Sequence, residues 1–172
     1  MINGDYRRYR DGVLRESGIY AKGKRNSTFT EYYQDGVTPR KETPMQQGKI
    51  DGTVKTYFHN GKMETEKEYR QSVESGRERR FDSKTGEQIF ESHYIDGKKD
   101  GEEWEIFEDA STLRSRIIRH YRNGKLDGSY RVESTRDGKP YITIEGQYTD
   151  GEKSGRWKQY NATDDTTHEW DE

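Results

Sequence analysis

Hydrophobic and polar positions alternate along this chain in short runs separated by glycine-containing turns. Before several tyrosines, large apolar residues stand at even spacings: Met63 lies six residues before Tyr69, and Phe90 lies four before Tyr94. A period of two places such residues on one face of a strand. The dipeptides Asn-Gly and Asp-Gly, as in "YRNGKLDGSY" at residues 121–130, interrupt the runs and are strong hairpin signals. The pattern predicts short β-strands throughout.

The runs belong to a repeated unit with the motif Tyr-x-x-Gly-Lys-x-x-Gly-x-x-x-x-aromatic. Neighbouring copies begin 24 to 27 residues apart. A half unit precedes them, because Gly4 stands five residues before Tyr9, as Gly52 stands five before Tyr57. Such a unit cannot bury its apolar face alone, so neighbouring units must stack. The copies begin at Tyr20, Met45, Tyr69, Tyr94, Tyr121 and Tyr148.

Each unit is interpreted as one β-hairpin, with an outgoing strand after the motif and a returning strand that leads to the next motif. Both glycines of the motif are predicted to be turn residues, because a type I′ turn needs positive φ at both central positions. The predicted fold class is all-β: an elongated, single-layer antiparallel meander of about six and a half β-hairpin repeats, with roughly thirteen strands. Residues 1–160 form the repeat domain, and residues 161–172 form an acidic C-terminal tail or cap.

Aromatic side chains are expected to form a ladder along one face of the sheet. This ladder takes the aromatic residue that ends the motif, such as Tyr32 or Tyr160, and the tyrosine of each returning strand, with Trp104 on the same side. Residues two positions after the second glycine have the opposite parity to Tyr32 and Tyr160. They are predicted to lie on the other face: Phe29, Val54, Glu78, Glu103, Tyr130 and Trp157.

Composition favours an aromatic core over an aliphatic one. Leu, Ile, Val and Phe make up only 23 of 172 residues, which is typical of disorder when net charge is also high. Here 31 basic and 33 acidic residues nearly cancel, and 13 tyrosines, five phenylalanines and three tryptophans supply large areas to bury. There is no cysteine, no apolar run long enough to span a membrane and no signal peptide, so we expect a soluble, cytoplasmic protein.

Candidate chemistry is sparse. The Gly-Lys pairs lie between strands and lack the spacing of a phosphate-binding loop. His93 and His120 hold equivalent positions in neighbouring units, about 10 Å apart, which is too far for both to ligate one metal ion. No nucleophile and base stand out together, so we expect no enzyme, no metal site and no cofactor. Stretches such as "GRERRF" are typical of nucleic-acid surfaces, but acidic residues are equally dense, which argues against specific nucleic-acid binding.

The motif Tyr-x-x-Gly-Lys-x-x-Gly resembles the variant MORN repeat of bacterial proteins such as the YwqK-family antitoxins, over about residues 4–160. The resemblance implies a single-layer sheet of hairpins that binds other molecules, mainly proteins, with phospholipid binding attributed to some members. The chain departs from the pattern at Met45, at Ser72 and at Asn26-Ser27. Such departures suggest surfaces individualised for one partner.

The predicted function is a non-catalytic, antitoxin-like or immunity-like inhibitor, or a counter-defence factor of a mobile element, bacterial or phage. Its partner would be a toxin, or a defence or effector complex. A rigid repeat sheet suits this role, because a preorganised surface loses little entropy on binding. The alternative is a phospholipid-binding or scaffold module, although the charge balance argues against an anionic bilayer surface. Self-association through the sheet edges is also open.

The candidate partner-binding residues are aromatic or acidic. Aromatic side chains are enriched at binding hot spots, and acidic residues speed association with a basic partner. Tyr130 and Trp157 either contact a partner or fill a curled sheet. The tail is either an acidic arm anchored by Trp170 or a frayed, solubilising end. The candidates are Phe29, Trp104, Tyr130, Trp157, Asp164, Asp165 and Trp170.

Overall fold

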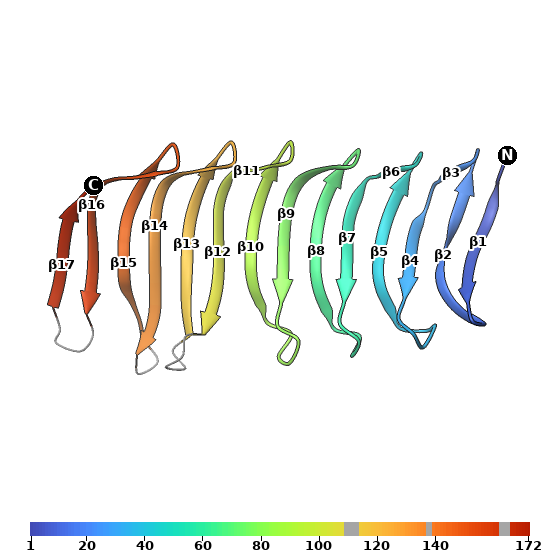
Figure 1. Ribbon diagram of the computed structural model, residues 1–172, viewed down its shortest axis with the longest axis horizontal. Coiled ribbons are helices and arrows are strands. Elements are labelled where there is room, and N and C mark those ends of the chain that lie inside the picture. Colours follow the sequence, from blue (N-terminus) through green and yellow to red (C-terminus); the bar gives the residue numbers. More distant parts are fainter. Residues whose placement is uncertain (109–113, 137–138, 162–165) are drawn as a thin grey trace. The chain divides into compact units, whose positions relative to one another are not determined.

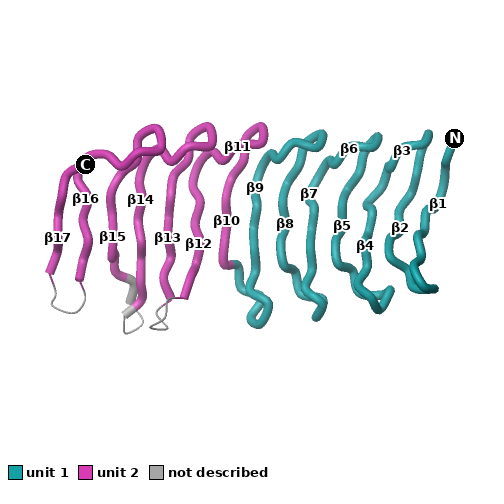
Figure 2. The backbone as a smooth tube through the Cα atoms, in the orientation of Figure 1, with its two compact units in different colours: residues 1–88 teal, residues 89–172 magenta. Residues whose placement is uncertain are grey.

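The chain folds into antiparallel β-meanders. The computed structural model describes residues 1–108, 114–136, 139–161 and 166–172. Within these residues there are strands and no helix, and the chain divides into two compact units, residues 1–88 and residues 89–172 (Figure 1, Figure 2). In each unit successive strands pair antiparallel, which confirms the all-β hairpin fold. The described part of the chain has no helix with the length and apolarity that crossing a membrane requires.

The outgoing arms are often split, which raises the number of strands above the roughly thirteen predicted. Unit 1 contains β1 (Gly4–Arg10), β2 (Val13–Ala21), β3 (Lys24–Arg25), β4 (Thr28–Tyr32), β5 (Pro39–Gln46), β6 (Lys49–Ile50), β7 (Gly52–Tyr57), β8 (Met63–Arg70) and β9 (Val73–Phe81). Unit 2 contains β10 (Gln88–Ile95, whose first residue ends unit 1), β11 (Lys98–Lys99), β12 (Gly101–Glu108), β13 (Arg114–Arg122), β14 (Lys125–Arg136), β15 (Lys139–Thr149), β16 (Glu152–Asn161) and β17 (Thr166–Asp171).

The first glycine of the motif lies in a two-residue turn, as predicted. At Asn123-Gly124 the φ angles are +51° and +86°, which are the two positive values of a type I′ turn. The other five copies have the same pair of positive φ angles: Lys22-Gly23, Gln47-Gly48, Gln71-Ser72, Asp96-Gly97 and Asp150-Gly151.

The second glycine is not a turn residue, and that prediction is wrong. Gly128 lies inside β14 with φ of +117°, where the pairing with β13 shifts register between Arg119 and Tyr121. A Cβ at Gly128 would lie 3.0 Å from the Cβ of His120. At Gly128 the second glycine therefore forms a β-bulge that bends the outgoing strand without ending it, whereas at Gly52 and Gly101 a new strand begins at the glycine.

Neighbouring turns are joined by hydrogen bonds. The Gly48 amide donates to the Arg25 carbonyl at 2.9 Å, and the Gly124 amide donates to the Lys99 carbonyl at 2.8 Å. A polar side chain just before the second glycine adds a bond: Asp100 Oδ2 accepts from the Asn123 amide at 3.0 Å. The Asp of the Asp-Gly pair thus binds the next turn of the repeat.

Aromatic packing lies on one face of each unit, which we call the ring face. It carries Tyr6, Tyr20 and Phe29 in unit 1 and Tyr130, Tyr148 and Trp157 in unit 2. The ring centroids of Tyr20 and Phe29 are 5.4 Å apart. The prediction that the Phe29 set faces away from the returning-strand tyrosines is therefore wrong. The turn pairs Tyr20 with Arg25, and Phe29 follows Arg25 by an even number of residues, so both share one face.

The two fully buried rings among the described residues, Phe29 and Trp157, each lie over a glycine of the preceding returning strand. A Cβ at Gly18 would come within 2.7 Å of the Phe29 ring, and one at Gly146 within 2.2 Å of the Trp157 ring. Neither glycine has a positive φ, so the space beside the ring is what excludes a side chain. Ring and glycine are matched across the strands.

We expect Gly146→Ala to destabilise the protein by about 1–3 kcal/mol, because the added methyl group overpacks the Trp157 ring. Urea denaturation followed by tryptophan fluorescence measures this. In the Gly146→Ala background, Trp157→Val should cost much less than it does alone, because the smaller side chain makes room. Additive costs for the two changes would contradict the matching of ring and glycine.

Candidate functional site

The predicted candidates on the ring face are packed within their own units. Phe29 is 1% exposed and lies under the Arg25 guanidinium, 4.2 Å from its carbon to the ring centroid. Trp157 is 2% exposed, and Tyr130 packs on it at 5.5 Å between centroids. Burial raises the pKa of the Tyr130 phenol. Phe29 and Trp157 thus offer almost no surface to a partner.

Of the remaining candidates, Trp104 and Trp170 are among the described residues and lie on different strands, β12 and β17. Trp104 follows Glu103, whose carboxylate reaches the ladder residue Tyr121, so alternation places Trp104 on the face opposite the ladder, not on the ladder side as predicted. The Arg116 guanidinium covers its ring at 4.5 Å. Trp170 lies on β17 and stacks on Trp157 at 6.2 Å. Asp164 and Asp165 lie outside the described residues.

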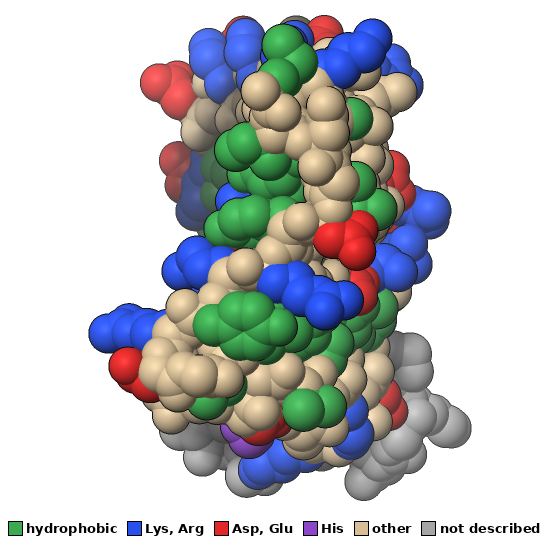
Figure 3. Space-filling view, turned by 90° about the vertical axis from the view of Figure 1, so that its right-hand side faces the viewer, with side chains coloured by type: hydrophobic (Ala, Val, Ile, Leu, Met, Phe, Trp, Pro, Cys, Tyr) green, Lys and Arg blue, Asp and Glu red, His purple; other side chains and the backbone are tan. Residues whose placement is uncertain are grey.

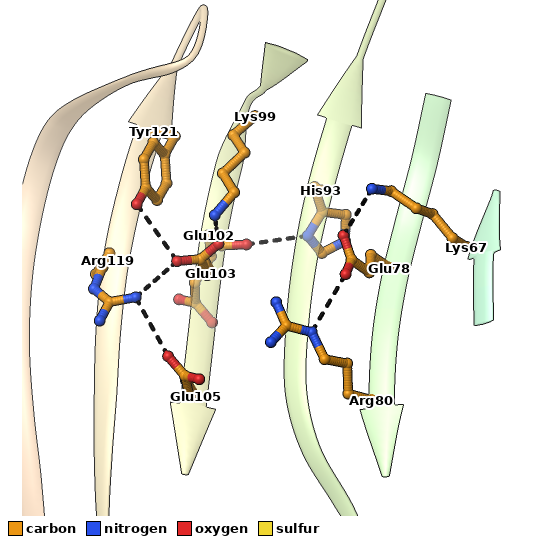
Figure 4. Close-up of polar contacts among 10 residues, drawn as sticks. All are labelled: Lys67, Glu78, Arg80, His93, Lys99, Glu102, Glu103, Glu105, Arg119 and Tyr121. Atoms are coloured by element: carbon orange, nitrogen blue, oxygen red, sulfur yellow. Dashed lines mark hydrogen bonds and ion pairs between the residues drawn. The ribbon is translucent and has the colours of Figure 1, made fainter. Parts of the chain in front are cut away.

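A buried carboxylate occupies the ring face of unit 2, where the sequence pattern gave no site. Glu103 is 1% exposed. Its carboxylate accepts hydrogen bonds from Lys99, from Arg119 Nη1 at 2.8 Å and from the Tyr121 hydroxyl at 3.4 Å (Figure 4). Burial acts to raise the pKa of Glu103, but the bonds from Lys99 and Arg119 outweigh it and hold the pKa below its usual value. Glu103 is therefore a charged, structural residue.

Unit 1 has an ionic group at the equivalent repeat position. Lys67 Nζ lies 3.0 Å from Glu78 Oε2 and 2.7 Å from Glu74 Oε1, and Arg80 Nε donates to Glu78 Oε1 at 3.3 Å (Figure 4). The ring face thus carries charge pairs as well as rings, in register along each unit.

His93 and His120 each lie within hydrogen-bond distance of a backbone carbonyl at equivalent positions of the repeat. His120 Nδ1 lies 3.3 Å from the Ser129 carbonyl, and His93 Nδ1 lies 3.1 Å from the Glu102 carbonyl; both carbonyls follow a second glycine. Ser129 Oγ is also 2.9 Å from His120 Nδ1, and Glu102 lies 3.7 Å from Nε2, so a serine, a histidine and a carboxylate meet. The repeated bond to the bulge carbonyl assigns these histidines a structural role. Among the described residues, no three His, Cys, Asp or Glu side chains gather as a metal site requires.

An open groove in unit 1 is the best candidate for binding. We call it the arginine–tyrosine groove. It encloses about 670 Å³, with Asp11 and Glu31 as its only lining carboxylates. Figure 3 looks onto the molecule from the β1 side, where hydrophobic side chains gather between lysine and arginine side chains. The lining arginines and tyrosines are Arg8, Arg10, Arg15, Arg40, Tyr32 and Tyr33.

Internal contacts hold three of the four groove arginines and leave Arg10 the most exposed. Arg15 Nη1 donates to the Tyr33 carbonyl at 3.0 Å, which ties β2 to the end of β4. Arg8 pairs with Glu16 at 3.3 Å, and Arg40 pairs with Glu31. Arg10 is 79% exposed, and its nearest carboxylate, on Asp11, is 3.9 Å away. The groove is therefore held in shape and keeps an excess of positive charge.

Sequence reasoning missed this groove because its residues come from separate segments, residues 8–15, 31–34 and Arg40. The stretch "YRRYR" at residues 6–10 was a visible signal, since it is the one run that joins tyrosines to three arginines without an acid between them. The net charge of the whole chain, −2, gives no indication of this local excess of arginine.

The comparisons with known proteins leave the family open. The sequence matches no model of a known protein family, and no curated protein is significantly similar to it. The likeness to MORN repeats therefore stays a resemblance of motif.

Glu103→Gln should destabilise unit 2 by about 2–3 kcal/mol at pH 7, because it leaves Lys99 and Arg119 without their buried counter-charge. Glu105→Gln is the matched control. That side chain is 40% exposed and 3.8 Å from Arg119, so its loss should cost less than about 1 kcal/mol.

The cost of Glu103→Gln should also depend on pH. The pKa of Glu103 is lowered on folding, so its contribution is full above the ordinary value of 4.5 and is lost as pH falls through the folded value. Chemical denaturation at pH 7, 5 and 3 should show the difference from wild type shrinking at pH 3. A difference that stays constant would refute the ionic account.

Proposed function

We propose that this protein is a non-catalytic inhibitor that binds a partner protein through the arginine–tyrosine groove. The antitoxin-like, immunity-like or counter-defence role fits such a protein. The observation that carries the proposal is the residue content of the groove. Four arginines and two tyrosines line one concave surface, and Arg and Tyr are among the residues most enriched at binding hot spots.

The charge of the groove favours an acidic segment on the partner. Guanidinium groups pair with carboxylates in bidentate geometry, and an electrostatic match speeds the encounter. Arg15 is already oriented by the Tyr33 carbonyl, so part of the ordering cost is met before binding. The target is then a protein whose functional surface carries clustered Asp or Glu.

Affinity purification from the native host tests this proposal. We expect a stoichiometric protein on the wild-type chain that is reduced at least tenfold on Arg10→Ser/Arg40→Ser, because both changes remove groove cations. The matched control is Arg122→Ser/Lys125→Ser, which removes two exposed cations, each likewise paired with one carboxylate, at a turn of unit 2. Recovery of the chain alone, or equal loss from both variants, would count against the groove.

The phospholipid alternative predicts that the same groove cations bind the protein to vesicles. Flotation with vesicles of phosphatidylcholine containing phosphatidylserine, in physiological salt, should leave the wild-type protein unbound, because the chain as a whole carries a net charge of −2. Vesicle binding that Arg10→Ser/Arg40→Ser abolishes would replace the inhibitor proposal with the lipid one.

A further inference from the structure

Strands β1 and β17 each have one edge without a paired strand in the described part of the chain. β1 pairs with β2 alone, and β17 pairs with β16 alone. Glu172 and Gly155 exchange both backbone bonds, at 3.1 and 3.2 Å, so alternation turns the amide and carbonyl groups of Glu169 and Asp171 outward. The Ile2 carbonyl accepts from Gly23, so the groups of Asp5 and Arg7 point outward from β1.

The two edge strands hold complementary places in the repeat. Tyr6 pairs with Gly18 as Tyr130 pairs with Gly146, so β1 is an outgoing strand. Trp170 pairs with Trp157 as Gly146 pairs with Tyr130, so β17 is a returning strand. Inside each unit, a returning strand is always followed by an outgoing strand that pairs antiparallel with it, as β15 is followed by β16.

One position at this kind of junction repeatedly carries an ion pair. Its two members are the residue just before the central residue of the returning strand, which is Gly146 in β15, and the residue just after the central residue of the outgoing strand, which is Trp157 in β16. Glu66 faces Arg79 at 2.8 Å, and Glu145 faces Lys158 at 3.7 Å. Glu42 faces Lys55 in the same register. Acid on the returning strand thus faces base on the outgoing strand at three of the six described junctions. The other three pair Ser17 with Thr30, Glu91 with Trp104 and Ile118 with Arg131.

The edge strands carry an acid and a base at the same two positions. Glu169 precedes Trp170 on β17, and Arg7 follows Tyr6 on β1, so they stand where Glu145 and Lys158 stand in β15 and β16. No ion pair joins Arg7 to another described residue. The surrounding charges agree: β1 holds three arginines and one aspartate, whereas residues 166–172 hold three acids and no lysine or arginine.

We propose that copies of this chain associate head to tail, with β17 of one copy pairing antiparallel with the edge of β1 of the next, so that Glu169 faces Arg7. The junction continues the strand register across two copies and places Trp170 beside Tyr6 on the ring face, a ring in the position that a glycine holds beside Phe29 and Trp157. Such a contact joins two different surfaces of the chain, so it generates rings or open chains of copies instead of a symmetric dimer. Figure 3 views the molecule from the β1 side, where lysine and arginine side chains lie beside hydrophobic ones.

Sedimentation equilibrium over a range of protein concentrations tests the junction. We expect the mass of the wild-type protein to rise with concentration without a limit at two copies. Arg7→Glu and Glu169→Arg should each weaken association about five- to tenfold, because like charges then face each other across the strands. Arg70→Glu, at an exposed arginine of β8, makes the same charge change away from both edges and should leave association unchanged.

A mixing experiment separates the junction from a general loss of fold or charge. An equimolar mixture of Arg7→Glu and Glu169→Arg should associate as strongly as wild type, because every junction between unlike copies again pairs an acid with a base. Glu169 also contacts Lys158 within its own chain at 3.6 Å, so recovery in the mixture shows that the variant is still folded. A single-chain mass up to about 1 mM would overturn the proposal. So would an effect of Arg7→Glu alone, which would indicate β1 pairing with β1.

Discussion

Each buried side chain in these meanders has to be matched by a residue on a neighbouring strand of the same sheet. Phe29 lies over Gly18, Trp157 lies over Gly146, and Glu103 meets Arg119. A fully buried ring such as Phe29 or Trp157 needs an empty position beside it, and a buried carboxylate needs a cation, so the choice at one position constrains the choice on the next strand. This strand-by-strand matching takes the place of the aliphatic core that the composition lacks.

The register of the matching comes from the backbone. The turn-to-turn bonds join amides to carbonyls, so they tolerate changes of side chain. At the departure from the motif, the Ser72 amide still donates to the Ile50 carbonyl at 2.7 Å, and Ser72 Oγ accepts from the Ile50 amide at 3.0 Å. Because backbone hydrogen bonds hold neighbouring hairpins in register, the matched pairs at the centres of the strands can be a ring with a glycine in one hairpin and a carboxylate with a cation in another.

The hairpin repeat and its turns were predictable because they depend on local rules. Period two and the Asn-Gly and Asp-Gly pairs act within about ten residues of chain. The ring face was misassigned because it depends on parity carried through a turn and on a bulge that the second glycine hides. The burial of Glu103 and the arginine–tyrosine groove were out of reach for a different reason. Glu103 meets Arg119 on another strand, and the groove joins three segments, so neither leaves a local pattern.

Phe29 and Trp157 on the ring face are buried by the chain's own packing, and the two surfaces proposed here share one strand elsewhere in the sheet, β1. Arg8 and Arg10 of β1 line the arginine–tyrosine groove, and Arg7 lies between Tyr6 and Arg8 on the same strand. A partner seated in the groove therefore stands beside the edge where a second copy would dock. Two ligands that compete for one strand lower each other's apparent affinity by the same factor. If both proposals hold, self-association and partner binding are linked: an assembled chain of copies leaves β1 free only at its end, and a partner that takes the groove disassembles it.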